Sequence, residues 1–151
     1  MTSWAVVDSG ILLATVLIEQ YSKEAKALIK SLTEQQMQIA VPVLFRYEIV
    51  AVLRKQVYRG TLTAEEGINN YLLLLAQPVQ AMVDDALLRR GYELAAQFNR
   101  PTAYDSQYLA VAERLGCEFW TVDERLYNTL TMHLSWVKWL GNFKEPTSIT
   151  S

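Results

Sequence analysis

Short apolar segments that resemble β-strands alternate with longer helical segments along the whole of this chain. The strand-like segments cover residues 4–7, 38–41, 79–83, 119–122 and 135–139. Consecutive strands that are separated by helices usually pair in parallel, because parallel strands need a long crossover connection. The sequence therefore predicts an α/β fold with a mainly parallel sheet covered by helices on both faces.

Capping and helix-breaking residues mark the predicted helix ends. Gly60 follows a helix that begins after Pro42, and glycine is common in the left-handed position that ends a helix. Thr63 and Glu66 have the spacing of a capping box for the next helix. The predicted helices cover residues 11–18, 22–32, 43–59, 64–76, 84 or 85 to 98, and 105–115, with a short helix beginning at 123.

Chain length and hydropathy predict one compact domain. The chain has 151 residues, of which 51% are hydrophobic and 20% are charged. We expect a single domain over residues 1–144 and a polar tail over 145–151. Apolar runs such as 71–76 are far shorter than the roughly 18 to 20 residues of a membrane-spanning helix, and the first residues lack the pattern of a secretory signal. A cytoplasmic protein without a membrane partner is expected.

Cysteine, histidine and net charge restrict the chemistry. Cys117 is the only cysteine, so neither an intrachain disulfide nor a cysteine-based zinc site is expected. His133 is the only histidine and has no evident catalytic partner, which argues against a Ser-His-Asp site. The formal net charge is -2, so the chain lacks the basic excess of proteins that hold long stretches of nucleic acid. A nucleic-acid substrate would have to be held locally.

Three aspartates stand where predicted strands and helices meet. Asp8 and Asp123 directly follow predicted strands, and Asp105 opens the helix that leads into the second of these strands. In open α/β sheets, ligands bind beyond the carboxyl ends of the strands, near the point where the strand order reverses. The three carboxylates would converge there if the two strands are neighbours. Alternatively, each aspartate serves only as a helix N-cap.

Glu48 lies in the middle of a predicted helix, on an apolar stripe with Leu44 and Val52. An unpaired carboxylate buried there would cost several kcal/mol or become protonated. A salt bridge to Arg46 or Arg54 is one solution. The other is a divalent cation that Glu48 shares with the aspartates, because such an ion turns the repulsion between carboxylates into coordination.

A cation held by these acids would be Mg²⁺ or Mn²⁺ rather than zinc, since the chain offers carboxylate oxygens and no cluster of histidines or thiolates. Pairs of such ions, about 3.5 to 4 Å apart, recur in enzymes that cut phosphodiester bonds, where they activate water and neutralise phosphate charge. The acids themselves thus point to metal-dependent phosphodiester chemistry.

Four short segments carry the acids: Val6–Ser9, Val41–Glu48, Tyr104–Ala110 and Phe119–Leu126. In their order and spacing they resemble the PIN-domain family, and more narrowly the VapC-type ribonuclease toxins of bacterial toxin-antitoxin pairs. The resemblance covers nearly the whole chain. It implies a three-layer α/β/α fold with a parallel five-stranded sheet of order 3-2-1-4-5, and a divalent-metal-dependent endoribonuclease activity on RNA.

The resemblance also implies roles for individual residues and two protein partners. The positions that match the catalytic metal ligands of the family are Asp8, Glu48, Asp105 and Asp123. The positions that match polar residues beside the site, which orient a ligand or a water, are Ser9, Thr121 and Asn128. Family members commonly form homodimers and are silenced by an antitoxin whose segment fills the active-site groove, so both partners are expected here.

Several cations and tyrosines are candidates for contacts with RNA. The candidates for phosphate contacts are Arg46, Arg54, Lys55 and Arg59 on one predicted helix, and Arg125 beside Asp123. The candidates for stacking on unpaired bases are Tyr47, Tyr104 and Tyr108. A solvated helix face would explain the cations equally well, and core packing would explain the tyrosines.

Other functional classes make different demands. A phosphatase or phosphoacceptor domain also has an Asp after its first strand, but Gly10 stands where an aspartate-based phosphatase has its second Asp, and the acidic pair of receiver domains is missing. A non-catalytic binding module, with the acids as helix caps and residues 71–76 in a partner surface, is one alternative. A PIN nuclease that processes RNA outside a toxin pair is another.

Overall fold

Five parallel strands form the centre of the protein. The computed structural model describes residues 2–146. The strands are β1 (Trp4–Val7), β2 (Gln38–Pro42), β3 (Val79–Met82), β4 (Glu118–Thr121) and β5 (Val137–Trp139), in the order β3-β2-β1-β4-β5. Every neighbouring pair is parallel. The predicted α/β class, sheet order and parallel pairing are therefore confirmed.

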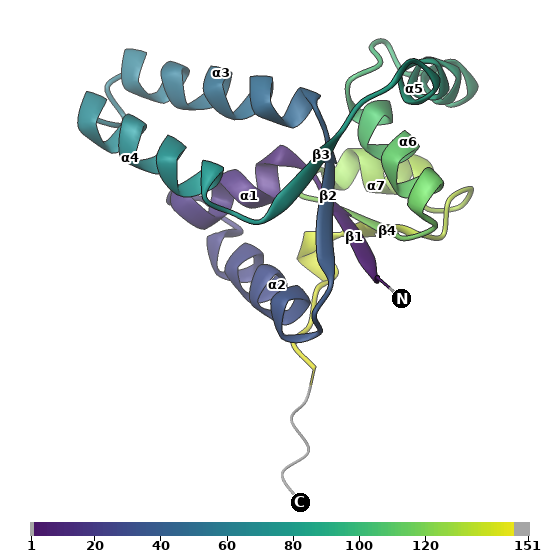
Figure 1. Cartoon of the computed structure of the whole chain (residues 1–151), viewed down its shortest axis with the longest axis horizontal. Coiled ribbons are helices and arrows are strands. Elements are labelled where there is room, and N and C mark those ends of the chain that lie inside the picture. The colour runs from purple at the N-terminus through teal and green to yellow at the C-terminus, as the bar shows by residue number, and fades with distance from the viewer. Residues whose placement is uncertain (1, 147–151) are drawn as a thin grey trace, which may run out of the picture.

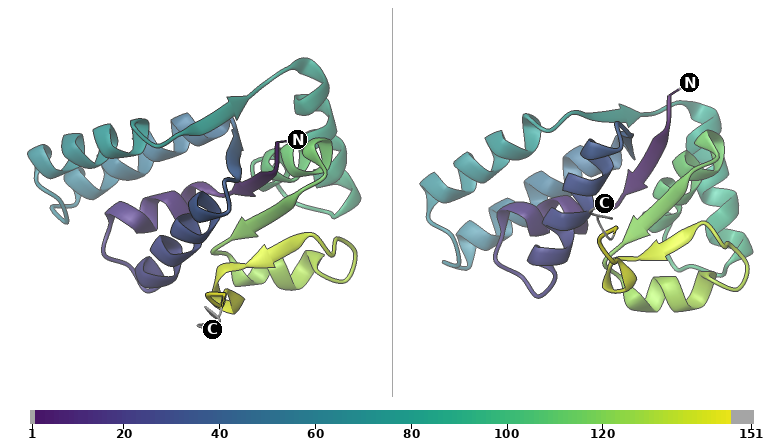
Figure 2. Two further views of the ribbon diagram at one scale, coloured as in Figure 1. Left: turned by 60° about the horizontal axis from the view of Figure 1, so that its bottom comes forward. Right: turned by 90° about the horizontal axis from the view of Figure 1, so that it is seen from below.

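Helices cover both faces of this sheet and make a three-layer arrangement (Figures 1 and 2). One face carries α1 (Ser9–Val16), α2 (Ser22–Glu34), α3 (Leu44–Tyr58) and α4 (Ala64–Leu75). The other carries α5 (Asp85–Gln97), α6 (Asp105–Leu115) and α7 (Glu124–Leu130). A short 3-10 turn, η1 (Leu140–Asn142), follows β5. Both sheet faces are therefore shielded from solvent, which explains why the central strands are almost wholly apolar.

The strand order reverses between β1 and β4. The chain moves outward from β1 to β2 and β3, then returns to the other side of β1 for β4 and β5. Val6 in β1 pairs with Ala40 of β2 on one side and with Phe119 of β4 on the other, and all three side chains are buried. The predicted neighbours β1 and β4 thus lie side by side, and their carboxyl ends form the switch point where such sheets bind ligands.

The observed element limits differ from the predicted ones by a few residues at most. Helix limits differ by at most two residues, and one such difference is at the end of α1, which stops at Val16 instead of Ile18. The Leu17 amide still bonds to the Leu13 carbonyl, but Leu17 itself is extended, and its carbonyl accepts the Ser22 hydroxyl at 2.8 Å. Ile18 is consequently left fully exposed. A polar side chain from the next helix thus ends α1 where hydrophobic periodicity continues.

The C-terminal tail predicted for residues 145–151 lies mostly outside the described residues, which end at 146. Across residues 2–146, none of the helices is both long enough and apolar enough to span a lipid bilayer.

The start of α5 is stabilised by a charged pair with α6. Asp84 is the N-cap of α5: its Oδ1 accepts the Leu87 amide at 2.8 Å, and its two oxygens accept both terminal nitrogens of Arg114. The hydrogen bonds from Arg114 and then from Leu87 lower the pKa of Asp84 to about 2. Because this value is below that of the unfolded chain, the pair stabilises the fold at neutral pH and stops doing so as the pH falls toward 2.

Asp84→Asn is expected to lower the Tm at pH 7 by roughly 1 to 3 °C, since asparagine keeps the cap but loses the charge that pairs with Arg114. The loss should be smaller at pH 3, where the unfolded chain already binds the proton. Thermal unfolding followed by circular dichroism at both pH values tests this, with Asp85→Asn as the neighbouring control. An equal loss at pH 3 and pH 7 would contradict the assignment.

Candidate active site

Asp8 joins β1 to both α1 and β4. It directly follows β1 and is the N-cap of α1, where its Oδ1 accepts the Ile11 amide at 2.9 Å. Its Oδ2 accepts the Thr121 hydroxyl at 2.6 Å and the Val122 amide at 3.1 Å, both from the end of β4. The capping role expected as an alternative is therefore real, but it uses one oxygen only. The other oxygen holds the carboxyl ends of the two central strands together.

The surroundings of Asp8 disfavour its negative charge. Burial of the carboxyl raises its pKa to about 6, against the hydrogen bonds from Thr121, Ile11 and Val122, which favour the charged form. The nearby charge of Glu48 raises the pKa further. The site thus holds a carboxylate whose ionisation at neutral pH is costly without a positive partner.

Glu48 on α3 contacts α6 across the carboxyl edge of the sheet. Its Oε1 accepts the Tyr108 hydroxyl at 2.6 Å, and among the described residues it forms no ion pair with Arg46 or Arg54. Burial raises the pKa of Glu48, as does the charge of Asp105, while hydrogen bonds from Tyr108 and Ser9 act in the opposite direction. The salt-bridge interpretation of Glu48 is therefore wrong, and its partner is a tyrosine hydroxyl instead of an arginine.

Tyr108 is a buried residue and not a base-stacking one. Its side chain is 2% exposed, and its ring stacks on Phe119 of β4 with centroids 5.8 Å apart. Burial and the adjacent Glu48 charge raise its pKa far above the usual range, so it remains a hydrogen-bond donor at every working pH. Of the three tyrosines considered for RNA bases, this one instead fixes the position of Glu48.

Asp105 is the first residue of α6 and does not cap it. The N-cap position belongs to Tyr104, which makes no side-chain cap, so the capping interpretation of Asp105 is wrong. The Arg100 Nη2 lies 3.6 Å from Asp105 Oδ2. Burial raises the pKa of Asp105, the Arg100 charge lowers it, and the charge of Asp123 raises it further. Asp105 therefore faces both a cation and another acid.

Asp123 is the most exposed of the four acids. It is the N-cap of α7, where its Oδ1 accepts the Leu126 amide at 3.0 Å, and its own amide donates to the Thr121 hydroxyl at 3.0 Å. Thr121 is fully buried and so connects Asp8 with Asp123. Thr121 thus lies beside the acids as expected and hydrogen-bonds to two of the residues concerned.

The charges of the four acids affect one another's pKa values in pairs around the switch point. The charge of Glu48 raises the pKa of Asp8, the charge of Asp105 raises that of Glu48, and the charge of Asp123 raises that of Asp105. The coupling is pairwise: within residues 2–146, no three acidic, cysteine or histidine side chains lie close enough together to enclose a metal ion. Four like charges are thus gathered at one edge of the sheet, with only carboxylate oxygens as strong donors.

The remaining predicted site residues fall into two groups. Ser9 lies against Glu48 and, like Thr121, is beside the acids. Asn128 is exposed on α7, and its side chain makes no hydrogen bond within the part of the chain that the structure describes. The expectation that Asn128 lies near the site therefore has no contact to support it.

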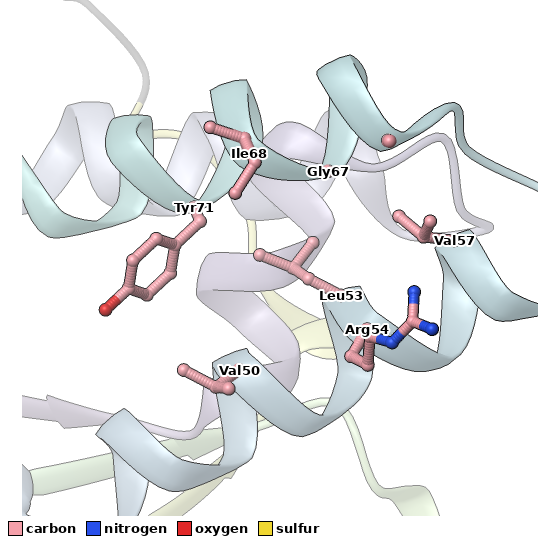
Figure 3. A pocket seen from close by; sticks show the side chains of 8 residues that line it. Val50, Leu53, Arg54, Val57, Gly67, Ile68 and Tyr71 are labelled. Carbon is pink, nitrogen blue, oxygen red and sulfur yellow. The ribbon is translucent and has the colours of Figure 1, made fainter.

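The predicted phosphate-binding arginines do not gather around the acids. Arg54 lines a groove of about 430 Å³ between α3 and α4, together with Leu53, Ile68 and Tyr71 (Figure 3). Arg46 lines a different cavity, formed with β2 and β3. Arg125 is exposed two residues beyond Asp123. Arg46 and Arg125 each lie two positions along the chain from one of the four acids, Glu48 and Asp123 respectively, and among the described residues neither forms an ion pair with it.

Sequence reasoning missed Arg100 and the true role of Tyr108. Arg100 stands in the loop before α6, five positions ahead of Asp105, and nothing in its spacing distinguishes it from an ordinary loop arginine. Its side chain is only 25% exposed, which is low for an arginine in a loop. It is the cation closest to the acids in the described ion pairs.

These features define a class: a doubly wound parallel α/β protein with carboxylates at the switch point of a 3-2-1-4-5 sheet. The sequence profile of the PIN domain matches residues 5–129, and the chain belongs to the PIN-domain family. PIN domains are generally nucleases and typically use divalent metal ions, so the chain belongs to a superfamily of nucleases.

Among solved structures, the fold is similar to that of PAE2754 from Pyrobaculum aerophilum, with a TM-score of 0.67. The two chains are 20% identical, and the match covers 93% of each. This similarity shows the fold alone. Comparison with curated proteins gave no match.

Proposed function

We propose that this protein is a divalent-metal-dependent endoribonuclease whose metal ligands are Asp8, Glu48, Asp105 and Asp123. The observation that carries the proposal is the gathering of four carboxylates at the switch point of the sheet, where Thr121 holds Asp8 and Tyr108 holds Glu48. Burial and then a neighbouring acid raise the pKa values of Asp8, Glu48 and Asp105 there. A capping role alone does not explain this, because Glu48 and Asp105 cap nothing.

The donor set fits Mg²⁺ or Mn²⁺. The acids supply only hard oxygen ligands, and a cation between them offsets both the repulsion and the burial that raise the pKa of Asp8 to about 6. To share one ion, the acids must approach more closely than they do now. Asp123 is exposed, and its charge already raises the pKa of Asp105.

The residues around the acids have positioning roles in this proposal. Tyr108 holds Glu48 by its hydroxyl, and Thr121 holds Asp8 and the backbone amide of Asp123. Arg100 offers a cation for the RNA phosphate next to Asp105. A bound divalent ion would supply activated water and neutralise charge on the phosphate.

We further propose that the nuclease is the toxin of a VapBC-type pair. This rests on the resemblance of the four acid-bearing segments to VapC-type toxins. It brings three expectations: a homodimer, a cognate antitoxin that covers the acids, and action on RNA in the cytoplasm. A PIN nuclease of RNA processing, or a binding module that never cuts, would share the fold.

Cleavage of a single-stranded RNA by the purified protein tests the activity. We expect cutting with Mn²⁺ or Mg²⁺, none with EDTA, and none by Asp105→Asn, while the exposed control Asp85→Asn cuts normally. Absent cutting would leave only the binding module, and cutting that persists in EDTA would reject the proposed metal dependence. Growth arrest on expression, relieved by a small neighbouring reading frame, supports the toxin role, and active protein without arrest would favour RNA processing.

A further inference from the structure

A second cavity lies beside the acids, above the carboxyl ends of β2 and β3. It measures about 350 Å³, within the usual range for small-molecule sites. The walls come from α3 on one side of the sheet and from α5 and α6 on the other. Most lining residues are apolar, and they include Pro42, Leu44, Met82, Leu87, Leu88 and Val111.

Two tyrosines place this cavity next to the acids. Tyr47 precedes Glu48 on α3, Tyr104 precedes Asp105 at the start of α6, and both line the cavity. Their side chains are 72% and 61% exposed, so neither ring is occupied by core packing. The hydrogen bond from Tyr108 to Glu48 holds α3 and α6 together at this edge. The cavity and the acids thus share the same two helix segments.

One polar side chain reaches the apolar wall. Gln107 on α6 lines the cavity, and its amide packs directly on Gly91 of α5, where any Cβ would collide with it. The cavity therefore combines exposed aromatic rims with an apolar body, while the Gln107 amide is directed at α5.

We infer that this cavity is a subsite for one unstacked RNA base of the nucleotide next to the cleaved phosphate, an inference that rests on the proposed nuclease function. Unpaired RNA bases are recognised by stacking on aromatic side chains and by hydrogen bonds to their edges. Tyr47 and Tyr104 supply the stacking faces, and the apolar lining of the cavity accommodates the flat ring. The phosphate then lies by Asp105 and Arg100, one residue and four residues from Tyr104.

An RNA base explains these features better than an apolar side chain of a protein partner. Base stacking needs exposed aromatic faces next to a phosphate site, and the two free tyrosines are the residues that directly precede two of the acids. The large groove between α3 and α4 has no such relation to the acids. The inferred subsite makes single-stranded RNA the substrate, because a base within a duplex cannot enter the cavity.

Tyr47→Ala and Tyr104→Ala test the subsite, with Tyr47→Phe and Tyr104→Phe as conservative variants and Tyr58→Ala as the matched control. Tyr58 is also exposed, at 81%, but lies at the far end of α3. One readout is kcat/KM with Mn²⁺ on a single-stranded RNA, intact or with an abasic ribose at one position at a time. The other is quenching of 2-aminopurine in the same RNA by the Asp8→Asn protein, which leaves the RNA uncut.

We expect each alanine variant to lose roughly 5- to 100-fold in kcat/KM, since stacking on one aromatic ring contributes that factor. The phenylalanine variants and Tyr58→Ala should stay near wild type. An abasic ribose at the subsite should remove the difference between wild type and the alanine variants, and quenching at that position should disappear in them.

The subsite is overturned, while the nuclease stands, if two results are found together. The alanine variants cut RNA as fast as wild type, and in the Asp8→Asn protein they leave the quenching unchanged. If the alanine variants cut and quench normally but a cognate antitoxin no longer neutralises them, the cavity binds the protein partner instead, and the base subsite is again overturned. Tyrosine-dependent quenching without metal-dependent cutting by wild type would keep the base subsite and reject the nuclease. Neither cutting nor quenching would reject both.

Discussion

Asp8→Asn is expected to reduce metal-dependent RNA cleavage by roughly 1000-fold or more while raising the stability of the metal-free protein. The first effect follows because a metal-assisted reaction draws several kcal/mol from the ion, and each 1.36 kcal/mol is tenfold in rate. Asparagine keeps an oxygen for the Ile11 amide but removes a charge from the centre of the proposed site.

The stability effect comes from the raised pKa. A carboxyl with a pKa of about 6 in the folded chain and 3.8 in the unfolded chain costs about 3 kcal/mol when it is ionised above pH 6. Asn removes this cost but turns its amide hydrogens toward the Val122 amide, which loses an acceptor. We expect a net gain of up to about 2 kcal/mol at pH 7.5, fading by pH 4 where Asp8 is itself protonated.

Urea unfolding in EDTA at pH 7.5 and pH 4, together with RNA cleavage in Mn²⁺, measures both effects. Adding Mn²⁺ should stabilise the wild type and not the variant. Asp85→Asn should change neither property. Cleavage within tenfold of wild type would remove Asp8 from the proposed metal ligands, and a variant that is less stable at pH 7.5 than at pH 4, relative to wild type, would contradict the burial argument.

Tyr108→Phe is expected to lower kcat/KM by about 10- to 100-fold, the usual effect of losing a group that orients a metal ligand. Phenylalanine keeps the ring that stacks on Phe119, so packing is preserved, while Glu48 loses its 2.6 Å hydrogen bond. Because Tyr108 acts through Glu48, the apparent affinity for Mn²⁺ should fall together with the rate.

Calorimetric titration of Mn²⁺ and steady-state cleavage compare the variant with Tyr21→Phe, a half-buried tyrosine that packs edge-on against Trp139. The control should match wild type in both assays. A Tyr108→Phe protein with lower stability but unchanged Mn²⁺ affinity and rate would show that the hydroxyl serves the fold alone.

The parallel sheet was predictable because it follows from local signals. Alternating strands and helices require parallel pairing, and Asp8 and Asp123 stand directly where strands end, so their meeting needed only β1 and β4 to be neighbours. The capping box at Thr63 was equally readable, since both of its hydrogen bonds lie within four residues. Order along the chain was sufficient for the parallel pairing and the capping box, whereas the strand order 3-2-1-4-5 was expected from the resemblance to the PIN-domain family.

The partners of each acid were not predictable, because they come from distant parts of the chain. Glu48 and Tyr108 are 60 residues apart, and Asp8 and Thr121 are 113 apart. Helical periodicity places Arg54 on α3, but it does not determine that the side chain lies in the groove with α4 instead of near the acids. Local pattern identified the acids, and only tertiary packing determines what each of them contacts.

The hydrogen bond between Tyr108 and Glu48 also has a mechanical consequence. It bridges the two helical layers, since α3 lies on one face of the sheet and α6 on the other (Figure 1). A shift of either layer therefore displaces a proposed metal ligand directly, without passing through the sheet. The position of Glu48 therefore depends on both helical layers at once, including the parts of α3 and α6 that lie far from the acids.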